Sequence, residues 1–568
     1  MSNAIESIST CFGRWRHSHN LSLLALFVVE AIIFYLHVAW DVAPYYPPRF
    51  DQLSYYLGTY DLIGAVHASG PSALVDELLQ SRNATGTTFV LQGALLALIG
   101  GEDRTAILSI NLLYWFVVQS IFFFVIRSRT GRIDFAWIGI ALLLSAQTLF
   151  NTAGGIYDYR FDFSALCLYG IFACLIVWSG SFRHTSRISA IVLASILLVY
   201  DRFFTIAYVV GVLGVLLALS AYELWSSSAT NIVALRRARN ILLSATITGI
   251  VCFPRLYLSR NAIYGYYVVG HVLSEEKFIR ARELGLSSLM DHLFYYPVSV
   301  LTRHVGPLTF LLGAALLSWS LWSDRVPWDA LLTRPYRFGQ EFVALGTAVL
   351  APIAILTLNI SKSPVVGDIV VVPIVLAMVL FGASVWPRPT PLNRKPLWTA
   401  RLPAAAMALG LTAFAVRGLS SADLAPRLDL DRINLLAETI ARYAADNNLD
   451  RLTMSTDRVV DYDNAIIPEL FSIERFHRKL EVDGLFGHGA YGIFATPRDE
   501  ALRLFAQSDV IILTDAVTDR SYPFPINTKI TEYWDEIWRQ TNRDYELIYS
   551  TEIFGIPYRV FVRPPPKS

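Results

Sequence analysis

The chain has 568 residues, of which 54% are hydrophobic and only 16% are charged. Together with a mean hydropathy of +0.45, this composition excludes an ordinary soluble globular protein and predicts that most of the chain lies in lipid. The 47 lysines and arginines nearly cancel the 46 aspartates and glutamates, which argues against nucleic acid and against a strongly acidic macromolecule as partners.

Apolar runs long enough to cross roughly 30 Å of hydrocarbon follow one another along the chain. They begin near residues 21, 105, 133, 163, 188, 203, 240, 305, 341, 366 and 401. We therefore predict a polytopic α-helical membrane protein with about eleven spans. The segment 87–100 is shorter and contains glycine, so we interpret it as a re-entrant or juxtamembrane helix instead of a full crossing.

Arginine placement predicts the orientation of these spans. With the N-terminus in the cytoplasm, the inward segments are 127–132, 181–187, 236–239, 325–337 and 388–401, and every one is basic, as the positive-inside rule requires. The outward segments are then 41–104, 151–162, the Asp201–Arg202 link, 258–304, 359–365 and the tail. This arrangement makes residues 1–420 a transmembrane module.

The tail, residues 421–568, has the mixed composition of a soluble domain. Segment 433–449 has helical periodicity, and 530–542 is a second predicted helix. Strands are predicted at 452–460, 509–516, 545–551 and 558–564. These elements predict a compact periplasmic α/β domain with its own core. The domain contains no Walker loop and no metal-spaced His/Cys cluster.

Two outward loops carry acidic residues just beyond membrane spans. In YYPPRFDQLSYY (45–56), tyrosines hold Asp51 near the lipid–water boundary. In GGIYDYRFDF (154–163), Asp158, Arg160 and Asp162 alternate. Both loops face the same compartment, and their acidic residues are candidates for catalysis. The alternative is that each aspartate is a helix cap or a topogenic charge.

Segment 258–304 is basic although it is predicted to face outward. His271, Lys277, Arg280 and Arg282 lie in it, and positive charge on this side favours an anionic partner such as a phosphate headgroup. The alternative is a solvated helix balanced by Glu275, Glu276 and Glu283.

Four charged residues lie within or between apolar runs. Lys362 in the link 359–365 is either a lipid-phosphate contact or a snorkelling interfacial lysine. Glu30 and the Asp201–Arg202 pair are most simply interpreted as polar contacts inside the bundle.

These features resemble the C-type glycosyltransferase superfamily of integral membrane enzymes, which includes protein O-mannosyltransferases and the bacterial lipid A aminoarabinose transferase. The resemblance covers most of residues 1–420. It rests on an acidic residue in a long first outward loop, a second acidic motif after the third span, and a later basic loop. One difference is that Gln52 follows Asp51 where many relatives have a second acidic residue. This difference argues against a paired-carboxylate or metal-binding site.

The resemblance implies a role for each of these residues. Asp51 is expected to be the catalytic base, and Asp158 and Asp162 are the competing catalytic carboxylates. The expected substrate-binding residues are Arg160, His271, Lys277, Arg280, Arg282 and Lys362, with the two lysines, Arg280 and Arg282 as phosphate ligands.

The implied function is a glycosyltransferase of the bacterial inner membrane. It would move a sugar from a polyprenyl-phosphate-linked donor to a hydroxyl of a glycan, lipid or protein on the periplasmic side. A carboxylate base and fixed positive charge suffice for this chemistry. No cofactor is expected, and the lack of a strong metal motif predicts metal independence. The alternatives are a secondary transporter or lipid-linked sugar flippase, and a structural subunit of an envelope assembly. Transporters often have related halves, and no such symmetry is evident.

Overall fold

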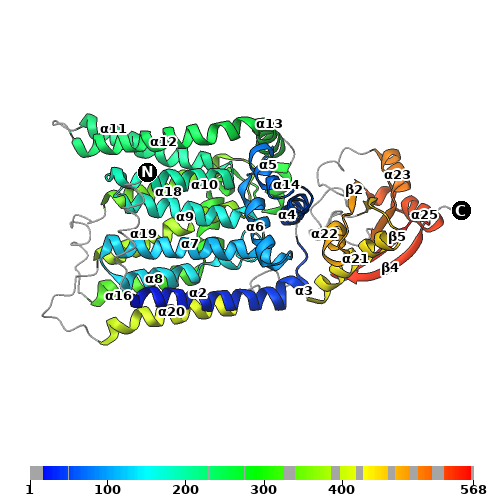
Figure 1. Ribbon diagram of the computed structural model, residues 1–568, viewed down its shortest axis with the longest axis horizontal. Coiled ribbons are helices and arrows are strands. Elements are labelled where there is room, and N and C mark those ends of the chain that lie inside the picture. The colour runs from blue at the N-terminus through cyan, green and yellow to red at the C-terminus, as the bar shows by residue number, and fades with distance from the viewer. Residues whose placement is uncertain are drawn as a thin grey trace.

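A computed structural model describes residues 17–48, 50–226, 231–273, 276–323, 339–385, 397–417, 427–457, 467–486, 497–514 and 530–564. It shows a long bundle of helices with a small α/β domain at one end (Figure 1). The predicted inward segment 325–337, most of 388–401, Glu275 and the start of the tail at 421 lie outside the described residues.

Helices occupy all the predicted span positions. They are α2 (His17–His37), α7 (Arg104–Thr130), α8 (Ile133–Leu144), α9 (Phe161–Trp178), α10 (Ile188–Asp201), α11 (Thr205–Ser226), α12 (Ile232–Leu258), α16 (Pro307–Ser323), α18 (Gly339–Leu358), α19 (Val371–Val385) and α20 (Leu397–Arg417). Among the described residues, 8 helices are long and apolar enough to cross a membrane, or up to 9 if a bent pair counts as one span. The polytopic helical fold class is confirmed, while the count of about eleven stays a prediction.

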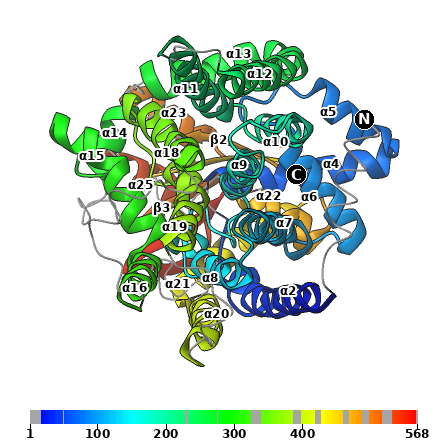
Figure 2. The same ribbon diagram turned by 90° about the vertical axis from the view of Figure 1, so that its left-hand side faces the viewer.

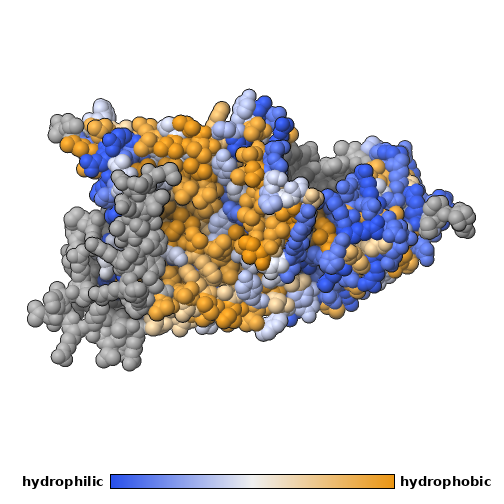
Figure 3. Space-filling model, viewed as in Figure 1, coloured by the Kyte–Doolittle hydropathy of each residue, from blue (hydrophilic) through white to orange (hydrophobic). Residues whose placement is uncertain are grey.

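The bundle is arranged around α9, which is buried along nearly its whole length. Figure 2 looks along the bundle and shows α9 surrounded by α7, α10, α18 and α19. Hydrophobic side chains cover the flank of the bundle in a broad band, whereas the C-terminal domain is mostly hydrophilic (Figure 3). Because α9 is at the centre, the residues at its start lie where several helices meet.

Three of the basic segments predicted to share one side do lie together. Arg237 Nε donates to the carbonyl of Ser181 at 3.2 Å, and Ser181 Oγ donates to the carbonyl of Gln340 at 2.9 Å. Arg129 forms an ion pair with Glu341. Segments 127–132, 181–187 and 236–239 therefore meet at one end of the bundle, as the orientation prediction requires.

Helix α4 (Phe50–Ser69) and several short helices cover the end of the bundle next to the C-terminal domain (Figure 1). The short helices are η1 (Val38–Val42), α3 (Ala43–Tyr45), α5 (Ser72–Gln80), α6 (Thr88–Gly100), η2 (Gln147–Phe150) and η6 (Val366–Val370). Helix α6 is the short apolar helix predicted at 87–100.

Segment 258–304, predicted as a loop, is largely helical. It contains α13 (Arg260–Ile263), η4 (Tyr264–Leu273), α14 (Glu276–Glu283), α15 (Leu289–Ser299) and η5 (Val300–Val305). The stretch Leu289–Val305 forms a pair with the start of α16, bent by 80°. The apolar helical path therefore begins before the span start predicted near residue 305.

The C-terminal domain is a five-stranded sheet with helices. Its elements are α21 (Arg427–Asp446), β1 (Arg451–Thr456), α22 (Ile467–Phe476), β2 (Glu481–Phe486), α23 (Arg498–Gln507), β3 (Val510–Thr514), η9 (Ile530–Glu532), α25 (Trp534–Asp544), β4 (Glu546–Ile553) and β5 (Ile556–Val562). The strand order is β2-β1-β3-β5-β4. Strand β1 is parallel to β2 and β3, and β5 is antiparallel to β3 and β4.

Positive φ angles of +51° and +76° at Phe554 and Gly555 form the tight turn of the predicted closing strand pair. The predicted strands at 452–460 and 509–516 correspond to β1 and β3, and residues 458–460 and 515–516 lie outside the described residues. The sequence did not predict β2, α22 or α23.

The domain is anchored to the bundle through α22 and α4. Leu470 and Phe471 of α22 belong to the same buried apolar cluster as the bundle. Arg104 Nε lies 2.9 Å from Glu474 Oε1, and the Tyr60 hydroxyl donates to the same oxygen at 3.0 Å. The domain thus contacts the helix that carries Asp51.

Candidate active site

Four segments meet at the end of the bundle that carries the short helices. They are the first turn of α4, the loop 151–160, the first turn of α9 and the residues after α10. Asp51 lies in the first turn of α4, where the partial positive charge of a helix N-terminus favours a carboxylate. Its side chain is 54% exposed. Asp51 is therefore accessible to a substrate.

Asp158 and Arg160 form a buried ion pair behind Asp51. Arg160 Nε lies 3.1 Å from Asp158 Oδ2, and Arg160 Nη1 lies 3.9 Å from Asp51 Oδ2. The amide of Gly154 donates to Asp158 Oδ2 at 2.6 Å. Gly154 has a φ of +81°, and a Cβ there would lie 2.5 Å from Val365 Cγ1. Only glycine fits this turn, so the loop that positions Arg160 is closely packed.

Burial and charge set the protonation of this pair. Burial raises the pKa of Asp158 from its ordinary value of 3.8 to about 6, although the positive charge of Arg160 opposes the shift. Burial disfavours the charge of Arg160, but the carboxylates of Asp158 and Asp51 raise its pKa further. Arg160 is therefore a permanent cation held beside an accessible carboxylate.

Asp162 and Arg202 form a second ion pair close to the first. Asp162 lies in the first turn of α9 and pairs with Arg202, which directly follows α10. The Arg202 guanidinium also lies over the ring of Phe161, 4.6 Å from its centroid. Arg202 was interpreted from the sequence as a bundle contact, and the structure places it in the site.

Asp368 of η6 was not singled out in the sequence. It is 2% exposed, and it interacts electrostatically with both Asp162 and Arg202. An aspartate inside the apolar run VVGDIVVV is the signal that would have identified it.

Tyrosines surround the two ion pairs. Tyr55 lies one turn after Asp51 and contacts the Phe161 ring edge-on, with centroids 5.0 Å apart. Burial, followed by the negative charge of Asp51, raises the pKa of Tyr55. The same two causes raise the pKa of Tyr266 in η4. Both phenols therefore stay protonated and can donate hydrogen bonds to a bound anion or sugar.

The predicted basic residues of segment 258–304 lie farther out. His271 packs edge-on against Tyr266, with ring centroids 4.7 Å apart. Lys277 Nζ donates to the carbonyl of Val272 at 2.9 Å. Arg282 is exposed, whereas Arg280 is half-buried and interacts electrostatically with Tyr296 of α15. The structure brings His271 next to the tyrosines of the site but leaves Arg282 at the surface.

Backbone carbonyls surround the ammonium group of Lys362. Its Nζ donates to the carbonyls of Leu356 at 3.3 Å, Thr357 at 2.7 Å and Asn359 at 2.7 Å. These carbonyls lie at the C-terminal end of α18, where a cation is favourable. An ammonium has three N–H donors, so these contacts use all of them. Burial lowers the pKa of Lys362 to about 8.

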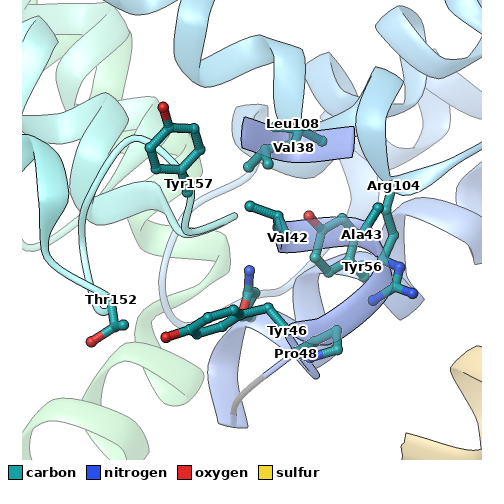
Figure 4. Close-up of a pocket in the computed structure, with 11 residues that line it drawn as sticks. Val38, Val42, Ala43, Tyr46, Pro48, Tyr56, Arg104, Leu108, Thr152 and Tyr157 are labelled. Carbon is teal, nitrogen blue, oxygen red and sulfur yellow. The ribbon is translucent and has the colours of Figure 1, made fainter. Parts of the chain in front are cut away.

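A small cavity lies behind the first turn of α4. It is bounded by η1, α4, the start of α7 and the loop 151–160, and Figure 4 shows Tyr56, Arg104, Thr152 and Tyr157 among its lining residues. Its volume of about 20 Å³ suffices for a single water molecule. Gln52 also lines it, directly after Asp51. No group of three or more His, Cys, Asp or Glu residues in the described part of the chain is placed to hold a metal ion.

The solved structures that resemble this chain include two of ArnT. The chain matches the crystal structure of ArnT from Cupriavidus metallidurans in the apo state with a TM-score of 0.56 and 12% sequence identity, over 96% of this chain and 98% of that chain. It matches ArnT from the same organism bound to undecaprenyl phosphate with a TM-score of 0.54 and 12% identity, over 94% and 97%. No protein-family model matches the chain, and no curated protein matches it in sequence. The chain therefore has the fold of ArnT along nearly its full length.

Proposed function

We propose that this multi-pass membrane protein is a glycosyltransferase. It transfers a sugar from a polyprenyl-phosphate-linked donor to a hydroxyl of a glycan, lipid or protein acceptor, on the periplasmic side of the bacterial inner membrane. One observation carries the proposal: an exposed carboxylate, Asp51, lies 3.9 Å from the buried guanidinium of Arg160, at the end of a membrane-embedded bundle. Support for the lipid-linked donor comes from the shared fold with ArnT bound to undecaprenyl phosphate.

The reaction needs a base and an anion site. Asp51 accepts the proton of the acceptor hydroxyl as the acceptor oxygen bonds to the anomeric carbon. The bond between that carbon and the phosphate oxygen breaks, and its electron pair leaves with the phosphate. Arg160 and Arg202 stabilise the negative charge that develops on the leaving phosphate. Free polyprenyl phosphate and the glycosylated acceptor are the products.

The buried carboxylates act through the arginines. Asp158 holds Arg160, and Asp162 holds Arg202. Both guanidinium groups are therefore already ordered before the donor binds. Asp158 and Asp162 are the competing candidates for the base. Their side chains are only 2% and 7% exposed, compared with 54% for Asp51. We therefore assign proton transfer to Asp51 and positioning to the other two.

The cations of α14 are a second candidate phosphate site. Helix α14 carries Lys277, Arg280 and Arg282. It follows η4, which carries Tyr266 and His271. Arg282 is exposed, so its charge is more strongly screened than those of Arg160 and Arg202. We propose that the cations of α14 attract the anionic donor while Arg160 and Arg202 hold its phosphate during transfer. Lys362 has no N–H left for a phosphate in its present position.

The test is release of free polyprenyl phosphate. The full-length protein, purified into lipid nanodiscs, is incubated with undecaprenyl-phosphate-linked hexoses and pentoses and with an extract of envelope acceptors. A transferase releases undecaprenyl phosphate only when an acceptor is present. A flippase or a structural subunit leaves the donor intact, and that result with every donor and acceptor would refute the proposal.

A further inference from the structure

A cleft of about 780 Å³ opens beside the candidate active site. Its walls are α4, α5, α6 and the loop 81–87. Tyr55, Phe161 and Asp201 also line it, and we call the part that they line its inner end. Phe161 and Asp201 directly precede Asp162 and Arg202 in the chain. The cleft therefore borders the cluster assigned to catalysis, and among its lining residues only Tyr55 has so far been given a role in binding.

The loop 81–87 is fixed in place over this inner end. The amide of Thr87 donates to the carbonyl of Tyr200 at 3.0 Å, and the amide of Phe203 donates to the carbonyl of Thr85 at 2.8 Å. Gly86 is required there because a Cβ would lie 1.9 Å from the carbonyl oxygen of Asp201. Arg255 of α12 donates to the carbonyls of Leu79 and Ser81. These contacts make the cleft a preformed structure.

The charge of the cleft decides what it binds. Asp61, Asp76, Glu77 and Asp201 line it, and its described lining residues include no lysine, arginine or histidine. Lys479 pairs with Asp61 at 2.8 Å, and Arg255 interacts electrostatically with Glu77. Asp76 accepts a hydrogen bond only from the neutral side chain of Gln80, at 2.9 Å, among the described residues. A phosphate therefore finds no cation in this lining.

The remaining lining groups are those that recognise sugars. Gln80 and Asn83 supply amides, and Ser54 and Thr85 supply hydroxyls. At the inner end, the rings of Tyr55 and Phe161 offer apolar surface for the C–H face of a pyranose. Asp201 is fully buried there, and its Oδ1 has no hydrogen-bond partner in the described part of the chain. A buried acceptor without a donor is unfavourable unless a ligand or water supplies one.

We propose that this cleft binds an uncharged or positively charged sugar and excludes an anionic one. The inference rests on the proposed function, because that function makes the bound sugar a part of either the donor or a glycan acceptor. The cleft and the phosphate site are then neighbours with opposite charge, separated by Phe161 and Asp162. That separation orients a sugar phosphate, because its phosphate is repelled by the acidic cleft and attracted by Arg160 and Arg202.

Binding is measured without transfer. Saturation-transfer NMR is recorded on the full-length protein in nanodiscs with three probes: methyl glucoside, glucosamine and glucuronate. Methyl glucoside and glucosamine should receive saturation, and glucuronate should not. Equal saturation of all three probes, or of none, would overturn the proposal.

Two substitutions on α4 provide matched variants. Gly58 lines this cleft, whereas Gly64 lines a different cleft on α4 and has no atom within 4 Å of a Cβ built on it. Gly58→Phe should abolish the glucoside signal, and Gly64→Phe should leave it unchanged. Retention of the signal in Gly58→Phe contradicts the assignment. Asp76 is exposed, so Asp76→Lys does not disturb helix packing. This substitution should weaken glucosamine binding by about twofold to fivefold and allow glucuronate to bind.

Competition distinguishes the two sources of the sugar. Displacement of methyl glucoside by an undecaprenyl-phosphate-linked hexose, but not by undecaprenyl phosphate, assigns the cleft to the donor sugar. Displacement by neither lipid assigns it to the acceptor, and displacement by undecaprenyl phosphate itself overturns the proposal. Sugar binding without any transferase activity would refute only the proposed function. Transfer without sugar binding would refute only this cleft.

Discussion

Two groups of cations at the same end of the molecule differ in how they are held. Arg160 and Arg202 have side chains that are only 11% and 12% exposed, and each pairs with a buried carboxylate. In α14, Arg282 is exposed and Lys277 caps a nearby carbonyl. Charges fixed in a water-excluded site stabilise a developing anion more strongly than mobile, solvated ones. We therefore propose that position and pairing, more than the number of cations, decide which group holds the phosphate.

The largest expected effect comes from removing the proposed catalytic base, Asp51. Asp51→Asn keeps the shape of the side chain and removes its basicity. Loss of a general base typically lowers the rate about 10²–10⁴-fold, so kcat should fall by that factor with the donor KM nearly unchanged. Steady-state transfer kinetics measure both constants. Glu102→Gln, in an exposed pair with His67, is the control and should keep normal kcat.

The next effect separates the buried arginines from the exposed cations. Arg202→Lys keeps the charge opposite Asp162 and loses the planar geometry that matches a phosphate. We expect kcat/KM for the donor to fall about tenfold to a hundredfold. Full replacement by glutamine is avoided, because an unpaired buried Asp162 costs about 3–5 kcal/mol of stability. Unchanged kcat/KM in a folded Arg202→Lys protein would remove Arg202 from the phosphate site.

A pH profile tests whether Asp158 positions Arg160. With its pKa raised to about 6 by burial, Asp158 is protonated below that pH and loses its ion pair with Arg160. Donor KM should therefore rise as the pH falls below about 6 and stay constant above it. Asp158→Asn should have a raised KM that no longer varies over this range. A wild-type KM that is flat to pH 5 contradicts the positioning role.

The same shift makes a stability prediction with a defined sign. Between pH 4 and 6 the native carboxyl of Asp158 keeps its proton, whereas the unfolded carboxyl, with the ordinary pKa of 3.8, has lost it. The native state binds more protons in this window, so the contribution of Asp158 to stability falls as pH rises. As the pH rises from 4 to 6, the melting temperature of the wild type should therefore fall relative to that of Asp158→Asn.

The smallest effect is expected in α14. Arg282→Ala removes an exposed charge, and screened surface charges contribute little to binding. Donor KM should rise about twofold to threefold at low salt, and the difference should disappear at high salt. A loss of kcat comparable to that of Arg202→Lys would reverse the ranking of the two groups.

The sequence predicted the fold better than it predicted the site. Hydropathy is local, so all the span positions and strands β1, β3, β4 and β5 could be located. Strand β2, EVDGLF, has no clear alternation and contains glycine, which explains why it was missed. Segment 258–304 was interpreted as a loop because its charges obscured the helical stretches.

The site depends on contacts between distant segments. Asp158 and Arg160 are close in sequence and were identified together, but nothing in the sequence joins Asp162 to Arg202 or places Asp368 beside them. Those pairings follow from the packing of α9 against its neighbours. Lys362 shows the converse: its position between spans fitted a lipid phosphate, and three backbone carbonyls surround it.

The most direct test of the account is the affinity of the full-length protein in nanodiscs for undecaprenyl phosphate. Two variants are compared with the wild type: Arg160→Lys combined with Arg202→Lys, and Lys277→Ala combined with Arg280→Ala and Arg282→Ala. The account predicts that the Kd rises about tenfold or more in the first and by less than about threefold at physiological salt in the second. A Kd that is unchanged in the double variant and strongly raised in the triple variant would contradict it.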